Sequence, residues 1–250
     1  MELRSTFDRV AELYDRARPT YPADLIDDVA ALGTRMLEIG PGTGQATRAL
    51  AERGVEVTAV ELGPRLAERA RRNVPQAEIV TAEFETWEPE RADFDAVVAF
   101  TSFHWLAPEL KYAKPARLLR PRGALAVVET THVRLEDGDP YWVESQEDYD
   151  AIVPSPDNRP PPLPEEVGDL RSELQASGLF TEVDVRQYRS DVSYTADDFI
   201  DVLGTYSPNI ARDPETTRRL FERIRTRITA RPSATVTAHY LLTLNVGRRV

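Results

Sequence analysis

Short apolar runs alternate with longer amphipathic stretches through the first half of the chain. Runs of strand length lie at 36–39, 56–61, 78–82, 95–100 and 124–129. The stretches 45–53, 64–73 and 108–119 space their apolar residues at helical intervals. The first is predicted to end at Gly54, and the second to begin at Pro64. This rhythm predicts an α/β fold, in which helices cover both faces of a mostly parallel sheet.

The pattern changes after Glu129. Residues 134–150 hold seven acidic side chains and one arginine, and 154–164 are too rich in proline for an ordinary helix or an inner strand. We therefore predict an insertion that is followed by a stiff connector. Tyr141, Trp142 and Tyr149 of this insertion suggest a lid or an interface, and the alternative is a solvated surface that covers one hydrophobic edge.

Regular elements resume towards the C-terminus. The pattern predicts helices at 165–176 and 214–230, strands at 183–188 and 235–246, and a further helix that Thr195 caps. The helix at 214–230 is rich in arginine. Its arginines are expected to form a solvated face, or alternatively to pair with the acidic insertion.

Composition excludes or disfavours several functions. The chain has 250 residues with 42 acidic and 31 basic side chains, and its formal net charge of −11 disfavours nucleic acid as a partner. It contains no cysteine and three histidines, which excludes thiolate chemistry and disfavours a metal site. The first twenty residues lack an apolar core, and the apolar runs are far shorter than the ~18 residues of a membrane span. We expect a cytoplasmic protein without a membrane partner, and its oligomeric state stays open.

The strongest chemical signal is the segment LEIGPGTGQAT at 37–47. A predicted strand leads into a turn with Gly40, Gly42 and Gly44, and a predicted helix follows at once. Glycine allows positive φ angles and lets a ligand approach without a Cβ in the way. Glu61, about 20 residues further on at the end of the next strand, completes the nucleotide-binding arrangement and is placed to accept both ribose hydroxyls.

The spacing of the glycines helps to distinguish between two classes of nucleotide ligand. Dinucleotide enzymes favour G-x-G-x-x-G, with the pyrophosphate at the helix N-terminus. Here the spacing is G-x-G-x-G, and Glu38 precedes it at the strand end. An acid at this place suits a ligand with an ammonium group and repels a pyrophosphate. A nicotinamide-dependent oxidoreductase remains an alternative, as does a glycine turn without a ligand.

The motifs EIGPGTG and VTAVE resemble those of class I S-adenosylmethionine-dependent methyltransferases, and the similarity covers at least residues 7–129. The resemblance implies S-adenosylmethionine as cofactor. It also implies a Rossmann-like, doubly wound sheet of seven strands, of which the antiparallel one is 235–246. The residues implied for the methionine part are Glu38, Gly40, Gly42, Thr43 and Gly44, those for the ribose are Glu61 and Leu62, and those for the adenine are Glu83 and Phe84. Glu83 stands where the family usually has aspartate.

Two further segments resemble the trans-aconitate-methyltransferase-like branch of this family. They are 7–22, which forms a helical cap over the cofactor in that branch, and the FHW ending of 101–105. The resemblance implies Tyr14, Arg18, Tyr21, Thr101 and Phe103 as residues on the cofactor side. Arg18 suits the methionine carboxylate. For Tyr14, Arg18 and Tyr21 the alternative is packing of an amphipathic arm.

His104 is the candidate catalytic residue. It follows a central strand, at the edge where open α/β sheets bind their ligands. An imidazole that titrates near neutrality can take a proton from an acceptor hydroxyl during methyl transfer. The alternatives are that His104 only positions the substrate, or that it simply begins a helix.

These inferences combine into one prediction. A single methyltransferase domain spans 1–250, with cap segments at 1–30, 131–168 and 195–231. It transfers a methyl group from S-adenosylmethionine to a small molecule by in-line displacement, with oxygen of a carboxylate or hydroxyl favoured as acceptor and no metal required. A non-catalytic protein that binds the cofactor is the remaining alternative.

Overall fold

The computed structural model describes residues 7–156 and 158–250. The described chain divides into two compact units. Unit 1 contains 7–19, 131–168 and 189–241, and unit 2 contains 20–130, 169–188 and 242–250. Across the described residues, no helix is both long enough and apolar enough to cross a membrane. Each unit is considered by itself below.

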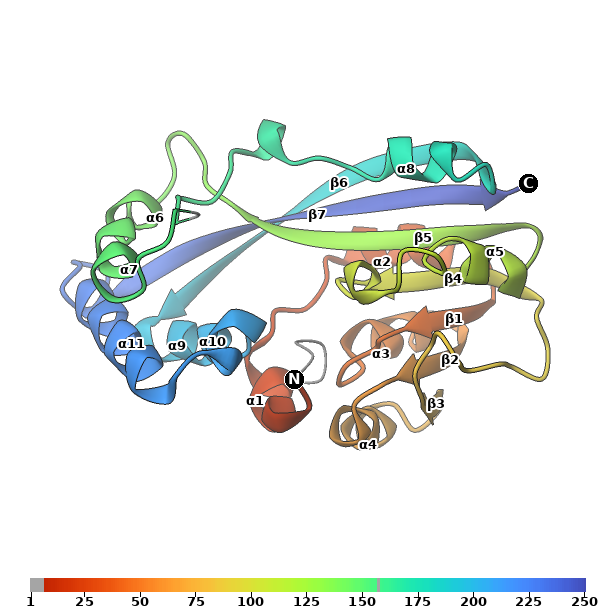
Figure 1. The fold of residues 1–250 in the computed structure, drawn as a ribbon, viewed down its shortest axis with the longest axis horizontal. Coiled ribbons are helices and arrows are strands. Elements are labelled where there is room, and N and C mark those ends of the chain that lie inside the picture. The colour runs from red at the N-terminus through yellow and green to blue at the C-terminus, as the bar shows by residue number, and fades with distance from the viewer. Residues whose placement is uncertain (1–6, 157) are drawn as a thin grey trace. The chain divides into compact units, whose positions relative to one another are not determined.

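The strands form one seven-stranded sheet in the order β3-β2-β1-β4-β5-β7-β6 (Figure 1). They are β1 (Arg35–Ile39), β2 (Glu56–Glu61), β3 (Glu78–Thr81), β4 (Phe94–Phe100), β5 (Leu119–Val133), β6 (Phe180–Thr195) and β7 (Thr235–Arg249). The pairs β1–β2, β1–β4, β2–β3 and β4–β5 are parallel. The strand order reverses between β1 and β4, and ligands of open α/β sheets bind at the carboxyl ends of the strands next to such a reversal.

The last strand is antiparallel to its neighbours, as the family resemblance implies. In unit 2 the end of β7 lies against the beginnings of both adjacent strands. Arg249 donates a hydrogen bond to the carbonyl oxygen of Leu119 in β5, and the Val250 amide donates to Leu179, which directly precedes β6. Figure 1 shows the β6 and β7 arrows running in opposite directions.

The helices of unit 2 surround the parallel strands. They are α2 (Ala23–Ala30), α3 (Gln45–Ala51), α4 (Pro64–Asn73), the 3₁₀ turn η3 (Phe103–Trp105), α5 (Ala113–Leu118) and α8 (Arg171–Ala176). Alternate strand residues enter one hydrophobic core on one face of the sheet; they include Leu37, Ile39, Val97, Ala99, Leu125 and Val127. Because side chains alternate between the two faces, burial of every second residue fixes the register of the strands and therefore the positions of their ends.

Four elements differ from their predicted bounds. The helix expected over 165–176 is a 3₁₀ turn at Pro164–Glu166 and, after a break, the shorter helix α8, which begins only at Arg171. The helix expected over 108–119 begins only at Ala113, because a turn occupies the preceding residues. Strand β5 continues through the expected turn at 121–123, where Arg122 adopts a φ of +60°. Strand β6 extends well beyond the expected 183–188 at both ends. The sequence did not predict these extensions, because most residues of the strand are at least partly exposed and therefore need not be apolar.

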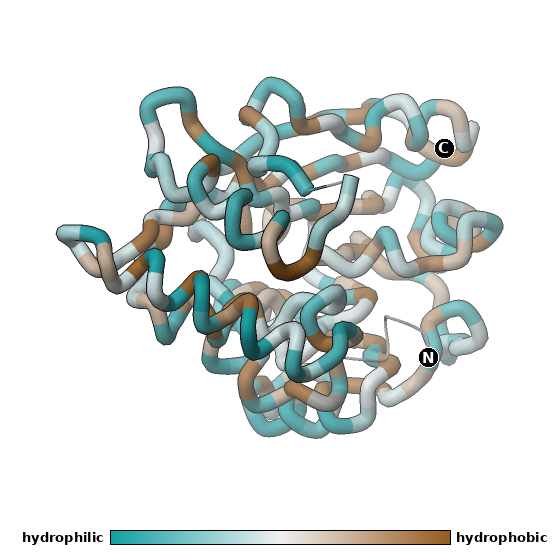
Figure 2. The backbone as a smooth tube through the Cα atoms, turned by 60° about the vertical axis from the view of Figure 1, so that its left-hand side comes forward, coloured by the Kyte–Doolittle hydropathy of each residue, from teal (hydrophilic) through white to brown (hydrophobic). Residues whose placement is uncertain are grey.

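Unit 1 is built mainly from helices. They are η2 (Phe7–Val10), α1 (Ala11–Ala17), α6 (Tyr141–Glu144), α7 (Gln146–Ile152), η4 (Pro164–Glu166), α9 (Ala196–Gly204), α10 (Ser207–Ala211) and α11 (Pro214–Thr229). Thr195 caps α9 by accepting a hydrogen bond from the Asp198 amide, as predicted. In Figure 2 the colour alternates between hydrophilic and hydrophobic along the helices, which is typical of helices that bury one face.

The acidic insertion contributes to the core of unit 1. Tyr141 and Trp142 are 1% and 5% exposed, and the Trp142 indole donates a hydrogen bond to the Thr237 carbonyl. Both rings are therefore buried within unit 1, and the suggestion that this segment forms a lid or an interface stays a prediction. The alternative predicted for the arginine-rich helix, pairing with the acidic insertion, is observed: Arg223 and Arg227 of α11 bind the buried carboxylate of Asp148 in α7.

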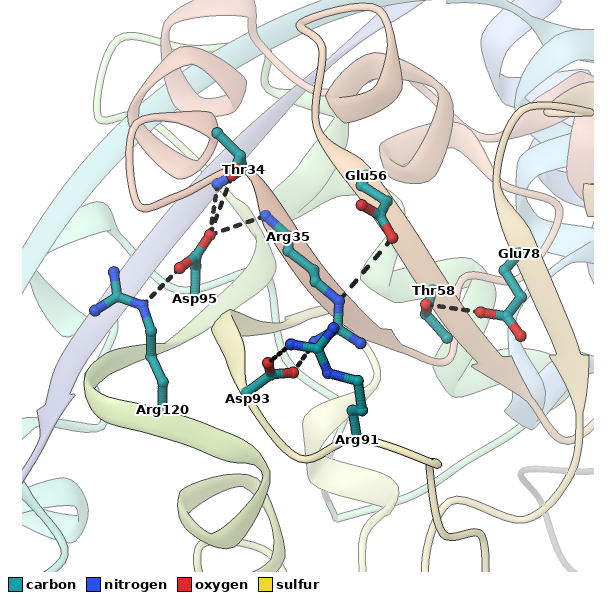
Figure 3. A network of polar contacts seen from close by, with 9 residues as sticks. All are labelled: Thr34, Arg35, Glu56, Thr58, Glu78, Arg91, Asp93, Asp95 and Arg120. Carbon is teal, nitrogen blue, oxygen red and sulfur yellow. Dashed lines mark hydrogen bonds and ion pairs between the residues drawn. The ribbon is translucent and has the colours of Figure 1, made fainter.

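A charged network joins the amino ends of the central strands (Figure 3). Asp95 of β4 accepts hydrogen bonds from the Thr34 amide at 2.8 Å, from the Arg35 amide at 3.0 Å and from Arg120 Nε at 2.6 Å. These donors lower the pKa of Asp95 to about 2, with the Arg120 hydrogen bond as the largest cause. One carboxylate therefore fastens the starts of β1, β4 and β5 to one another.

We expect the Asp95→Asn variant to lose about 2 kcal/mol of unfolding free energy at pH 7. Because the pKa is lowered in the folded protein from 3.8, this stability is present above about pH 4 and is lost as the pH falls towards about 2. Urea unfolding at several pH values measures the effect. Asp93→Asn is the matched control, since its exposed ion pairs should contribute less than about 1 kcal/mol. Equal losses in the two variants would contradict the assigned role of Asp95.

Candidate functional site

A glycine loop joins β1 to α3 at the carboxyl edge of the sheet. Gly40, Gly42 and Gly44 all adopt positive φ angles, as the sequence predicts for this turn. A Cβ on Gly40 would lie 2.8 Å from the Cβ of Ser102, so the loop passes too close to the end of β4 for any side chain. The backbone of the loop is therefore fixed by both conformation and space.

Glu38 is the buried acid of this site. It lies near the end of β1, is 1% exposed, and accepts a hydrogen bond of 2.6 Å from the Thr47 hydroxyl of α3. Burial, with a smaller contribution from repulsion by Glu61, raises the pKa of Glu38 to about 7. A carboxylate in such surroundings is stabilised by a cation. The site therefore favours a ligand group that carries positive charge.

Glu61 is the second buried acid and ends β2. One of its oxygens accepts a hydrogen bond from the Gly42 amide at 3.0 Å, and the other accepts one from the Gly63 amide at 2.8 Å. Since β1 and β2 are adjacent and parallel, the same carboxylate holds the glycine loop and the turn after β2. A carboxylate oxygen can accept more than one hydrogen bond, so a carboxylate at this place is also suited to accept a ligand hydroxyl.

Two buried polar atoms of the glycine loop have no hydrogen-bond partner among the described residues. They are Thr43 Oγ1 and Gln45 Nε2. Buried polar atoms in proteins are nearly always bonded, to protein, water or ligand. Together with the two acids, these atoms form a polar set that fits a ligand with an ammonium group and ribose hydroxyls.

The end of β4 is tied to both of its neighbours. The Thr101 amide donates to the Val128 carbonyl at 2.8 Å, and the Thr101 hydroxyl lies 3.0 Å from that of Thr130, although Thr101 has a strained φ of +56°. The Ser102 hydroxyl donates to the Ile39 carbonyl of β1. These bonds set the direction of the chain that enters η3, where His104 lies.

His104 is exposed on η3, with its ring 4.7 Å from that of Trp105. Partial desolvation and, to a smaller extent, the charge of Lys111 lower the pKa of His104 below its usual 6.5. Neutral imidazole therefore predominates at pH 7. A neutral imidazole can accept a proton, which is the requirement for a general base.

Comparison with known proteins identifies the segment that holds this site. A model of the methyltransferase domain family matches residues 37–127, which include the glycine loop, both buried acids and His104. This segment is a class I methyltransferase domain.

The methyltransferase relatives share this same part of the chain. A 131-residue segment is 34% identical to an uncharacterized methyltransferase of Mycobacterium tuberculosis, over 52% of this chain and 54% of that protein. A 138-residue segment is 30% identical to trans-aconitate 2-methyltransferase of Escherichia coli O157:H7, over 49% and 52%. The match therefore spans about half the length of these curated relatives.

The fold extends further than the sequence similarity. A candidate type II methyltransferase from Anaeromyxobacter dehalogenans superposes with a TM-score of 0.67 at 23% identity, and the match covers 92% of this chain and 97% of that one. This likeness shows that the chain has the Rossmann-like methyltransferase fold.

The remaining predicted residues of the methyltransferase domain differ in their surroundings. Phe84 and Phe103 are 4% and 2% exposed, and their rings are part of the hydrophobic core. Leu62 and Glu83 are half-buried after β2 and β3. The Tyr21 ring lies 4.8 Å from that of Phe100 at the end of β4. The roles assigned to these five residues stay predictions.

Tyr14 and Arg18 lie in unit 1, whereas the glycine loop lies in unit 2. The Arg18 guanidinium lies 4.9 Å from the centre of the Tyr14 ring. Their predicted contact with the cofactor stays a prediction.

Sequence reasoning missed the residues that hold the site together. Thr47 binds Glu38, the Gly63 amide binds Glu61, and Ser102 and Thr130 hold the end of β4. A hydroxyl in the first turn of the helix after the loop was the available signal for Thr47. The bonds of Ser102 and Thr130 depend on strand order, which short motifs do not contain.

The Glu38→Gln variant should make the cofactor-free protein more stable at alkaline pH. Because folding raises the pKa of Glu38 from 4.5 to about 7, the wild type loses stability as the pH rises between these values, whereas glutamine does not titrate. Unfolding free energies at pH 5 and pH 8 should show the advantage of the variant growing with pH. Glu56→Gln, at the exposed start of β2, serves as control. Parallel pH profiles for wild type and Glu38→Gln would contradict the raised pKa.

Proposed function

We propose that the protein transfers the methyl group of S-adenosylmethionine to an oxygen atom of a small-molecule acceptor. The observation that carries the proposal is the pair of buried acids, Glu38 and Glu61, at the tips of adjacent strands around a glycine loop. The ammonium group of S-adenosylmethionine supplies the positive charge that Glu38 lacks. Its ribose supplies the hydroxyls that Glu61 can accept, whereas a pyrophosphate would add negative charge beside two acids.

The remaining predicted residues complete the proposed binding site. Thr43 and Gln45 offer unpartnered polar atoms, and Glu83 follows β3, where its carboxylate suits the adenine amino group. When bound, the cofactor supplies a methyl group that its sulfonium already activates. The contribution of the protein is chiefly orientation, which can lower a barrier by roughly 7–11 kcal/mol.

The proposed acceptor atom follows from His104. Its lowered pKa leaves the imidazole neutral at pH 7, so it can take the proton that a hydroxyl group loses on methylation. A carboxylate acceptor would carry no proton at this pH. The Escherichia coli relative is named for trans-aconitate, which supports an acid as acceptor. Both are oxygen acceptors, and they differ in their need for His104.

The first test is cofactor binding. We expect S-adenosylhomocysteine, the product form, to bind in isothermal titration, and NAD not to bind. The Glu61→Gln variant should weaken S-adenosylhomocysteine binding at least about tenfold, because it removes a charged acceptor of hydrogen bonds. Glu56→Gln lies on the same strand and should leave binding unchanged. Tighter binding of NAD than of S-adenosylhomocysteine would refute the proposal.

The second test concerns the base. With methyl-labelled S-adenosylmethionine and an extract of small molecules as acceptor source, the His104→Ala variant should label a hydroxyl acceptor about 10²–10⁴ times more slowly than the wild type. Its affinity for S-adenosylhomocysteine should not change. Labelling within a few-fold of the wild type would remove the base role and favour a carboxylate acceptor.

A further inference from the structure

Glu129 is a half-buried acid of β5 that lies in unit 2, as the glycine loop and His104 do. The Thr101 amide, at the end of β4, donates to the carbonyl oxygen of Val128, so Glu129 lies beside the carboxyl end of β4. In the part of the chain that the structure describes, its carboxylate has no hydrogen bond and no ion pair. Such a carboxylate has lost part of its hydration without gaining a replacement.

The side chain of Glu129 lies on the face of the sheet that α8 covers. Because side chains alternate along a strand, Glu129 continues the row of Leu125 and Val127, which belong to the hydrophobic core of that face. Leu170 and Leu174, at α8, belong to the same core. Glu129 is therefore the polar end of an otherwise apolar row.

A second polar group without a partner lies on the neighbouring strand, β7. Thr243 is 1% exposed, and its Oγ1 atom has no hydrogen-bond partner among the described residues. Asn245 and Gly247 follow it at intervals of two and share its face. The Asn245 side chain accepts a hydrogen bond from the Leu170 amide, and a Cβ on Gly247 would lie 3.4 Å from Leu174. The Thr243 hydroxyl therefore also lies on the face that α8 covers.

The two unpartnered groups lie at the same level of the sheet. The side-chain nitrogen of Asn245 lies 3.4 Å from the Val127 carbonyl oxygen. Since β5 and β7 are antiparallel neighbours, two residues back along β7 correspond to two residues forward along β5. Thr243 and Glu129 are therefore cross-strand neighbours on one face. A buried hydroxyl and a carboxylate at one place, both without a protein partner, indicate a ligand.

The charges around Glu129 favour a cation. Burial raises the pKa of Glu129; the charge of Lys111 opposes this, and those of Glu173 and Asp169 add to it. The Lys111 ammonium lies 3.2 Å from an oxygen of Glu173, which also accepts a hydrogen bond of 2.8 Å from the Tyr112 hydroxyl. Three acids thus lie within the range of one base, and that base is already paired. A ligand with positive charge would stabilise the carboxylate of Glu129.

Lys111 also connects this place with His104. Its ammonium lies 5.2 Å from the centre of the Phe103 ring, directly before His104 in η3. The charge of Lys111 acts on both His104 and Glu129. The cluster therefore offers a base for one end of a small molecule and an anion for the other, and all of it belongs to unit 2.

We propose that Glu129 and Thr243 bind an ammonium group of the methyl acceptor, whose hydroxyl group is the one methylated. The inference rests on the proposed methyl transfer, and it names the acceptor as a hydroxyl compound with a basic nitrogen. The ammonium donates a charge-assisted hydrogen bond to Glu129, and the Thr243 hydroxyl can accept another. A protonated nitrogen has no lone pair for the methyl group. The hydroxyl oxygen bonds to the methyl carbon as the carbon–sulfur bond breaks, and its proton passes to His104.

Three phenols of similar shape distinguish the possible acceptor classes. Tyramine carries an ammonium group, para-ethylphenol carries no charge, and phloretate carries a carboxylate. Each is titrated into the full chain at pH 7 after saturation with S-adenosylhomocysteine, so that the cofactor site is already occupied. We expect tyramine to bind at least about tenfold more tightly than either of the other two, because it alone can form the charge-assisted hydrogen bond.

The variants assign this preference to the two residues. Glu129→Gln should weaken tyramine binding at least about tenfold, and should leave the affinities for para-ethylphenol and S-adenosylhomocysteine within about twofold. Thr243→Val removes only a hydroxyl and should weaken tyramine binding about threefold. Glu182→Gln is the matched control, because Glu182 is exposed on β6 and pairs with Arg122 at the surface. It should change none of these affinities.

Several results would overturn the inference. They are no binding of tyramine to the saturated wild type, tighter binding of phloretate than of tyramine, and tyramine binding that Glu129→Gln does not weaken. A tenfold loss of S-adenosylhomocysteine affinity in Glu129→Gln would assign Glu129 to the cofactor and overturn it as well. If Glu129→Gln does not fold, Thr243→Val decides, and an unchanged tyramine affinity then counts against the proposal. Failure of the wild type to bind S-adenosylhomocysteine at all would instead refute the proposed function.

Discussion

The methyltransferase domain depends on keeping two carboxylates buried side by side. Glu38 and Glu61 lie at the ends of neighbouring strands, and the charge of Glu61 adds to the effect of burial in raising the pKa of Glu38. The protein stabilises the pair with a threonine hydroxyl and two main-chain amides. Those amides belong to the glycine loop and to the turn after β2. The same hydrogen bonds therefore shape the loops and keep negative charge available for a ligand.

Much of the fold could be predicted from local pattern. Strands β1, β2 and β4 are short and apolar because both of their faces are buried, and such strands are recognisable without knowledge of their neighbours. Strand β6 was recognised only in part, since it lies at the edge of the sheet and most of its residues are at least partly exposed. The burial of Trp142 could not be predicted, because its partners Phe199 and Thr237 lie far away in the sequence.

The candidate site likewise contains some residues that the sequence predicts and others that it does not. The glycines and acids could be predicted, because their chemistry requires fixed residue types at fixed spacing within about 25 residues. The bond between Ser102 and Ile39 could not, since it requires β1 and β4 to be neighbours. Among the described residues Arg18 forms no ion pair, and the sequence does not predict this, because acids stand on both sides of it. Only the folded chain shows which acids are already paired with other arginines.

The network around Asp95 affects which amino-acid substitutions this protein can tolerate. It fastens the starts of the central strands, whereas the glycine loop and both buried acids occupy their opposite ends. The residues that join the starts of the strands are therefore different from those that form the candidate ligand site. Substitutions at the ligand end can diversify which molecules are accepted while the other end preserves the architecture. Evolution or protein engineering can therefore change the ligand-binding edge of such a sheet without losing the fold.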